Sequence, residues 1–148
     1  MSQHLLHAKA DIARLIPHAG AMCLLDGVVQ WDSARIRCVS RTHHDIENPL
    51  RAGGQLPAMC GIEYAAQAMA VHGGLAGMVG STPKAGYLVS LRDVNCRQSR
   101  IDNLEGDLIV DAERLMGDQS RVIYQFTLRV GAVEVLSGRA TVVIAAAT

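Results

Sequence analysis

The feature that most constrains the fold is an almost wholly apolar stretch, Gln55–Leu75, which carries a single acidic residue, Glu63. Its length and composition predict one long helix, with Pro57 in the first turn, where a proline is tolerated. The pair Gly73 and Gly74 weakens the helix towards its end. A helix that is apolar on all sides is normally buried on all sides. A buried carboxylate is costly without a partner, so Glu63 is the residue that most needs a functional explanation.

Around this helix the pattern changes to the alternation that is typical of strands. A short helix over 11–16 comes first, and a polar loop over 42–55 leads into the long helix. The predicted strands cover residues 22–31, 34–40, 87–99, 107–116, 120–130 and 133–145. This order predicts an α+β fold, one domain over 1–148, in which a curved antiparallel sheet wraps the central helix.

Composition excludes several classes of protein. The chain has 148 residues, a net charge of zero and an apolar fraction of 49%, which excludes a disordered chain and gives no basic footprint for nucleic acid. We expect no targeting segment, and no stretch approaches the roughly 20 apolar residues of a membrane span. Four cysteines stand singly, without metal-site spacing, at positions 23, 38, 60 and 96. They predict unbridged thiols in a reducing cytoplasm, and no metal.

Three segments together resemble the 3-hydroxyacyl-acyl-carrier-protein dehydratases. Residues Ile16–Val28 resemble the family's proline-histidine turn and the strand after it. Residues Gly61–Gln67 are similar to the glycine and the Glu-x-x-x-Gln run that open its central helix. Residues Leu91–Leu108 resemble its strand of basic residues and the following turn, although Glu105 stands where a proline is usual.

A closer resemblance is to the dehydratase-like group of aryl polyene pigment clusters, which shares the turn at 18–26 and the run at 61–64. The resemblance implies the hotdog fold, with the central helix as the sausage and the sheet as the bun. It also implies substrates carried on the phosphopantetheine of acyl carrier protein, and no other cofactor. We expect a homodimer or a heterodimer with another hotdog subunit, or a higher oligomer, because edge strands are seldom left open.

Dehydration of a 3-hydroxyacyl thioester needs a base for the C2 proton, an acid for the departing hydroxyl and donors at the thioester oxygen. By resemblance, Glu63 is the helix acid, Gly61 offers its N–H to the thioester oxygen, and Gln67 contacts substrate. Burial should raise the pKa of Glu63, as suits a general acid. The alternatives are that Glu63 anchors the helix through a backbone N–H or an arginine, and that Gly61 serves close packing.

The catalytic base cannot be carried over, because residues 52–57 contain no histidine where the family's loop histidine stands. A folded-back loop would be needed to deliver His43 or His44. His18 lies in the turn near the expected tunnel, where a structural role is the alternative to catalysis. His72 is nine residues past Glu63, about 900° of helix, and so lies on the opposite face.

Basic residues next to the tunnel mouth would suit an acidic carrier protein. The matching positions are Arg51, Arg92, Arg97 and Arg100, for which an ordinary solvated surface is the alternative. Three functions stay open: a dehydratase with an unusual base, a thioesterase in which Glu63 activates water, and a catalytically degenerate subunit that pairs with an active dehydratase.

Overall fold

The computed structural model describes residues 4–16, 20–77, 86–118 and 120–144. Its helices are α1 (Lys9–Leu15) and α2 (Gly61–Ala76), with single 3₁₀ turns at Gly20–Met22, Thr42–His44 and Ala58–Cys60. Its strands are β1 (His7–Ala8), β2 (Gly27–Trp31), β3 (Arg35–Ser40), β4 (Gly86–Cys96), β5 (Leu108–Gly117), β6 (Arg121–Val130) and β7 (Val133–Ile144).

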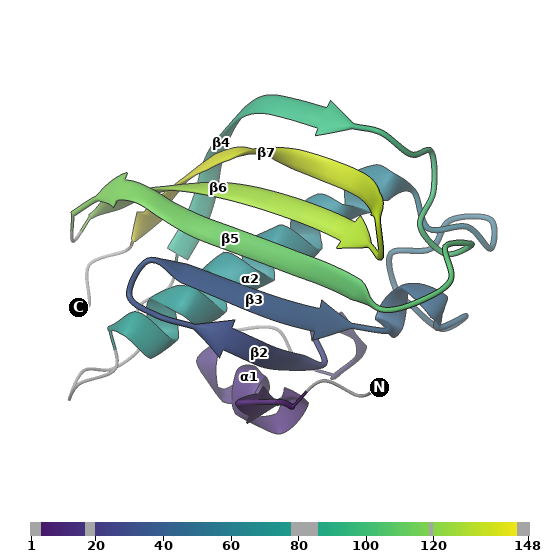
Figure 1. Cartoon of the computed structure of the whole chain (residues 1–148), viewed down its shortest axis with the longest axis horizontal. Coiled ribbons are helices and arrows are strands. Elements are labelled where there is room, and N and C mark those ends of the chain that lie inside the picture. The colour runs from purple at the N-terminus through teal and green to yellow at the C-terminus, as the bar shows by residue number, and fades with distance from the viewer. Residues whose placement is uncertain (1–3, 17–19, 78–85, 119, 145–148) are drawn as a thin grey trace.

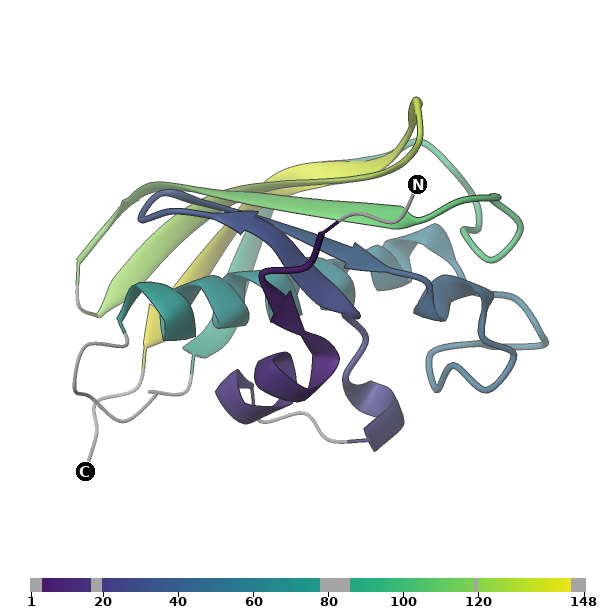
Figure 2. The same ribbon diagram turned by 60° about the horizontal axis from the view of Figure 1, so that its bottom comes forward.

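The described strands form one antiparallel sheet in the order β1-β2-β3-β5-β6-β7-β4. β4 follows α2 in the chain and lies at the edge of the sheet beyond β7 (Figure 1). Figure 2 shows the sheet as a curved layer above α2, with α1 below the end formed by β1 and β2. The predicted α+β hotdog arrangement is therefore confirmed.

The core lies between the inner face of the sheet and α2. Alternate residues of β6, among them Tyr124, Phe126 and Leu128, are buried against the helix, as the two-residue period predicts. The helix contributes small buried residues such as Ala65 and Ala68, which let it pack closely against the sheet.

Two predicted boundaries are wrong. The strand predicted to begin at residue 22 begins at Gly27, because Cys23 to Leu25 run as a buried irregular segment that is bonded to α2. The long helix begins at Gly61, after the 3₁₀ turn, instead of at residue 55. Residues 55–57 are extended and bond to the segment around Ile101, whose N–H donates to the carbonyl of Leu56 at 3.0 Å.

The expectation that α2 is buried on all sides is also wrong for the single chain. Ala66 and Ala70 are half-buried and Gly73 is exposed, and these residues lie on the helix face that points away from the sheet. None of the helices in the described part of the chain is long and apolar enough to cross a membrane.

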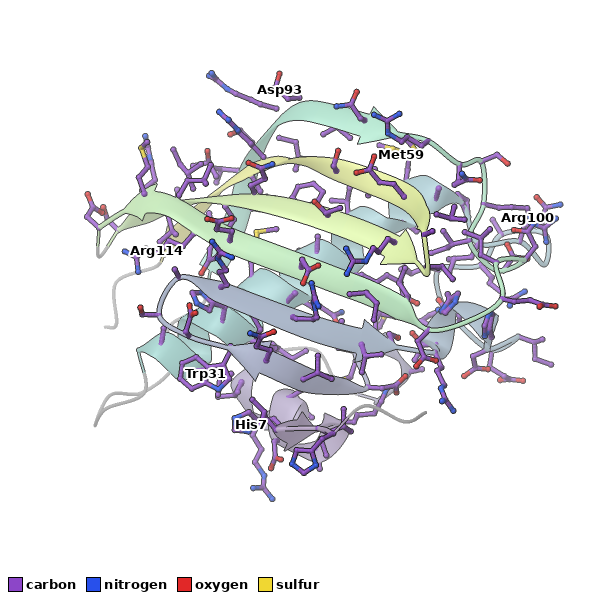
Figure 3. All side chains as sticks on the ribbon, viewed as in Figure 1. His7, Trp31, Met59, Asp93, Arg100 and Arg114 are labelled. Carbon is purple, nitrogen blue, oxygen red and sulfur yellow. The ribbon has the colours of Figure 1, made fainter. Side chains whose placement is uncertain are left out.

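The edge strand β4 is paired with β7 along one side only. Its side chains Leu88, Val89 and Leu91 are exposed apolar groups. Register shifts interrupt the pairing at Leu88/Ser90 and Arg92/Asn95, and Asp93 lies within the second with a φ of 53°. Figure 3 shows Asp93 at this outer edge.

Candidate functional site

The first turns of α2 place Glu63 on the helix face that the sheet leaves uncovered. Glu63 is half-buried, and the same face carries Ala66, Ala70 and Gly73 at the three- and four-residue spacing of one helix surface. Met59, in the 3₁₀ turn before α2, continues this face and is 49% exposed (Figure 3). A small apolar surface with one carboxylate is therefore open to a second molecule.

Gly61 is required by close packing at the start of the helix. A Cβ at this position would lie 2.8 Å from Cδ2 of Leu128 and 3.1 Å from Cδ2 of Leu136. Its own N–H is directed to the carbonyls of Ala58 and Met59 within the 3₁₀ turn. The geometry thus supports the packing alternative, and a role for Gly61 at a thioester oxygen stays a prediction.

Tyr64 anchors the first turn of α2 to the preceding loop, a role that the sequence did not predict. Its buried hydroxyl lies 2.7 Å from Oγ1 of Thr42 and accepts a hydrogen bond from Nδ2 of Asn48 at 3.0 Å. Burial raises the pKa of Tyr64, so the phenol stays protonated as a hydrogen-bonding group.

Gln67 is a second structural tie, one turn past Glu63. Its Oε1 accepts the N–H of Leu24 at 2.9 Å, and its Nε2 donates to the carbonyl of Met22 at 2.7 Å. The side chain is fully buried. These bonds satisfy backbone groups of the irregular segment before β2. A contact between Gln67 and substrate stays a prediction.

The histidine pair of the loop is bonded to the turn before β5. Nε2 of His43 lies 3.0 Å from the carbonyl of Gly106, and Nε2 of His44 lies 2.6 Å from that of Leu104. The His43 imidazole is buried, while His44 is exposed and stacks against it at 3.9 Å. Burial, with repulsion from His44, lowers the pKa of His43 to about 4. Both imidazoles therefore hold the loop in place.

The loop that lacks the expected histidine is a series of tight turns. Backbone hydrogen bonds close turns over Asp45–Asn48 and Asn48–Arg51, and a two-residue hairpin over Ala52–Gln55. Gly53 and Gly54 form the hairpin tip with φ of 60° and 78°, values that favour glycine. An imidazole directed at Glu63 is absent from this part of the described structure.

The histidine of α2, His72, lies in the core. His72 is buried on the sheet side of α2, with Nδ1 2.7 Å from the hydroxyl of Tyr124 and Nε2 2.9 Å from the carbonyl of Asp32. This confirms that it does not share a face with Glu63. His18 lies outside the described residues.

The four arginines predicted to bind the carrier protein have different surroundings. Arg51 is only 13% exposed, and it donates to the backbone carbonyls of His43, Asp45 and Gly54. It thus shapes the loop and offers little surface to a partner. Arg100 pairs with Asp102, a side chain that is only 5% exposed. The pKa of Asp102 is lowered mainly by this hydrogen bond with Arg100.

Arg92 and Arg97 are exposed. Arg97 forms an ion pair with Glu134, and Arg92 lies directly opposite Arg139 on β7. Two open depressions, of about 320 and 200 Å³, lie on the outer face of the sheet, away from α2. The described residues contain no group of three potential ligands that could hold a metal ion.

Comparison with known proteins identifies the family. The family model described as ApeP-like, ApeP dehydratase, matches residues 10–147. A search of curated protein sequences found no match. The dehydratase heterocomplex ApeI:P from Xenorhabdus doucetiae contains a chain that is 22% identical, with 91% of both chains covered and a TM-score of 0.82.

Thioesterase structures share the fold at lower similarity. A putative thioesterase from Silicibacter is 12% identical, with 97% of this chain and 96% of that chain covered and a TM-score of 0.66. A hypothetical thioesterase with coenzyme A from Streptococcus pneumoniae is 9% identical, with 80% and 84% covered and a TM-score of 0.59. The family match spans most of the chain, so the protein belongs to the ApeP-like dehydratase family.

Proposed function

We propose that this member of the ApeP-like family is the acid-bearing subunit of a dehydratase that acts on 3-hydroxyacyl thioesters. The observation that carries the proposal is the position of Glu63 on the uncovered face of α2, while His43, His44 and His72 each face a backbone carbonyl. Glu63 thus lies on a helix face that a second subunit can cover, and that subunit supplies the base.

In the proposed reaction, the base of the partner subunit removes the C2 proton of the 3-hydroxyacyl thioester. The electron pair moves into the C2–C3 bond as the C3 hydroxyl departs. Protonated Glu63 donates its proton to that hydroxyl, which leaves as water, and the product is a 2-enoyl thioester. The partner's base then loses the C2 proton to solvent, and Glu63 takes up a proton from solvent. Enclosure by the partner would also exclude water from the reacting groups.

The partner is a second hotdog subunit that covers β4 and the open face of α2. An unpaired edge with exposed Leu88, Val89 and Leu91 favours the addition of another strand. The small residues Ala66 and Ala70 permit close approach of another helix. The heterocomplex solved for the Xenorhabdus proteins supports a non-identical partner.

The substrate is carried on the phosphopantetheine of an acidic acyl carrier protein. Arg97 and Arg100 are the basic residues that best suit its docking. The backbone of Arg100 pairs with that of Pro57, just before the 3₁₀ turn that leads into α2, so Arg100 lies near the start of the helix. Figure 3 shows Arg100 at this end of the molecule. The four cysteines are unbridged, which fits a reducing cytoplasm.

The test uses the purified full-length chain, alone and mixed with a histidine-bearing hotdog subunit from the same genome neighbourhood. The substrate is a 3-hydroxyacyl group on carrier protein, and mass spectrometry detects the loss of water. We expect turnover by the mixture and a fall of at least about 100-fold with Glu63→Gln, the usual scale for removal of a general acid. Glu113→Gln, at an exposed position of β5 on the outer face of the sheet, is the matched control. Full activity of Glu63→Gln would refute the proposal.

A thioesterase is the second candidate, because a carboxylate beside an apolar surface also suits activation of water. Release of free thiol by this chain alone, abolished by Glu63→Gln, would favour that function over dehydration. If the mixture is active and Glu63→Gln has no effect, the chain is a structural subunit.

A further inference from the structure

The loop before α2 presents an exposed apolar side chain on a fully ordered backbone. Ile46 is 81% exposed, the highest value among the large apolar residues that the structure describes. It lies at the second position of the Asp45–Asn48 turn, where polar residues are usual. A single exposed apolar residue is unremarkable by itself, so the significance of Ile46 depends on how its loop is held.

The hydrogen bonds of the loop fix Ile46 in this outward position. Oδ1 of Asp45 accepts the N–H of Glu47 at 2.8 Å, and the N–H of Asn48 donates to the carbonyl of Asp45 at 3.0 Å. The buried amide of Asn48 then bonds the hydroxyl of Tyr64 on α2. From the other side, Nε of Arg51 donates to the carbonyl of Asp45 at 2.8 Å. A surface turn so firmly connected to the core is preorganised for binding.

The charge around Ile46 indicates the kind of partner. Its neighbours Asp45 and Glu47 are exposed acids, and Arg51 is directed inwards to the backbone. His44 connects the loop to the turn that carries exposed Glu105. An apolar tip with acidic neighbours suits an apolar pocket with a basic rim, and it disfavours an acidic carrier protein.

We infer that loop 45–55 is a docking element that inserts Ile46 into a basic-rimmed apolar pocket of the second hotdog subunit. The inference rests on the proposed function for the existence of that subunit. The loop leads through the 3₁₀ turn to exposed Met59 and the open face of α2. One partner can therefore cover the loop and the catalytic face together.

The experiment measures the dissociation constant between the full-length chain and the histidine-bearing hotdog subunit by calorimetry. Ile46→Ala should weaken binding by roughly 10- to 50-fold, because the variant no longer buries the outer carbons of the side chain. Met116→Ala is the matched control, since Met116 is 63% exposed at the far end of β5. Glu47→Gln should slow association and reduce its dependence on salt.

The outcomes separate this inference from the proposed function. If the unmodified chain does not bind the subunit at all, the proposed function fails. If it binds and Ile46→Ala binds equally well, the docking role of the loop is refuted while the proposed function stands. Loss of self-association with Ile46→Ala, with binding to the other subunit unchanged, would overturn the choice of partner. Circular dichroism checks that each variant is folded.

Discussion

The buried imidazole of His43 predicts that mild acid destabilises this protein. Burial is the main cause that lowers the pKa of His43 to about 4, and repulsion from His44 adds to it. The carbonyl of Gly106 and the carboxylate of Asp107 oppose the change. In an unfolded chain the pKa of histidine is about 6.5. Between these two values the unfolded chain binds a proton that the folded protein excludes.

The difference between the two pKa values determines the sign and the size of the change in the free energy of unfolding. The free energy of unfolding is unaffected well above pH 6.5 and falls as the pH is lowered through that value. The two pKa values set a ceiling of about 3 kcal/mol, of which about 2 kcal/mol is lost by pH 5. Burial also lowers the pKa of His72, which acts in the same direction. Asp102, whose pKa is lowered by Arg100, loses its contribution only at more acidic pH, below the ordinary range of carboxylates.

Urea unfolding at pH 7.5 and pH 5.0, followed by the fluorescence of the single tryptophan, Trp31, measures the effect. Protein concentration is held fixed because association changes apparent stability. His43→Gln keeps a donor for the carbonyl of Gly106 but cannot be protonated, so its loss between the two pH values should be smaller by about 2 kcal/mol. Exposed His4→Gln is the control. An unchanged pH dependence in His43→Gln would refute the reasoning.

Two further predictions concern the framework of the site. Asp102→Asn should lower the free energy of unfolding by about 2–4 kcal/mol, because buried Arg51 and half-buried Arg100 lose their counter-charge. Glu134→Gln, in an exposed ion pair, should cost less than about 1 kcal/mol by the same urea assay, and equal losses would contradict the argument. Gly61→Ala should lower thermal stability, because its Cβ overlaps Leu128, whereas Gly73→Ala has open space and should raise it by up to about 1 kcal/mol. Scanning calorimetry of both variants tests this, and stabilisation by Gly61→Ala would show that Leu128 moves aside at no cost.

The parts of the fold that depend on regular periodicity were predictable from the sequence. The alternation in β6 and the apolar run of α2 each determine what an element buries, so the central helix and the order of β2 to β7 around it were predicted. The short strand β1 was not. The irregular segment before Gly27 was not predictable, because its buried backbone depends on Gln67, which is 43 residues from Leu24 in the chain. Hydrogen bonds over such distances leave no local pattern.

Some features of the candidate site were also predictable from the sequence, and others were not. The sequence singled out Glu63 as the acid of an apolar helix. It predicted burial on all sides, so it did not show that Glu63, Ala66 and Ala70 share a half-buried face. The roles of Tyr64 and Asn48 could not be found, because a tyrosine in an apolar run is consistent with simple burial. For Gly61 the sequence left two explanations open. The short distance to Leu128 supports close packing, and a role at the thioester oxygen stays a prediction.

The loop that lacks the expected histidine has a defined hydrogen-bonded shape. A loop that lost its function without gaining another would be expected to loosen, since loop residues lie on the surface and vary freely. Here buried Asn48 and almost buried Arg51 bond the backbone of residues 42–54, and buried His43 bonds the carbonyl of Gly106 in the turn before β5. The hydrogen bonds of Asn48 and Arg51 therefore fix the shape of loop 45–55. A loop held in a defined shape next to Glu63 fits the proposal that the catalytic base comes from a partner subunit.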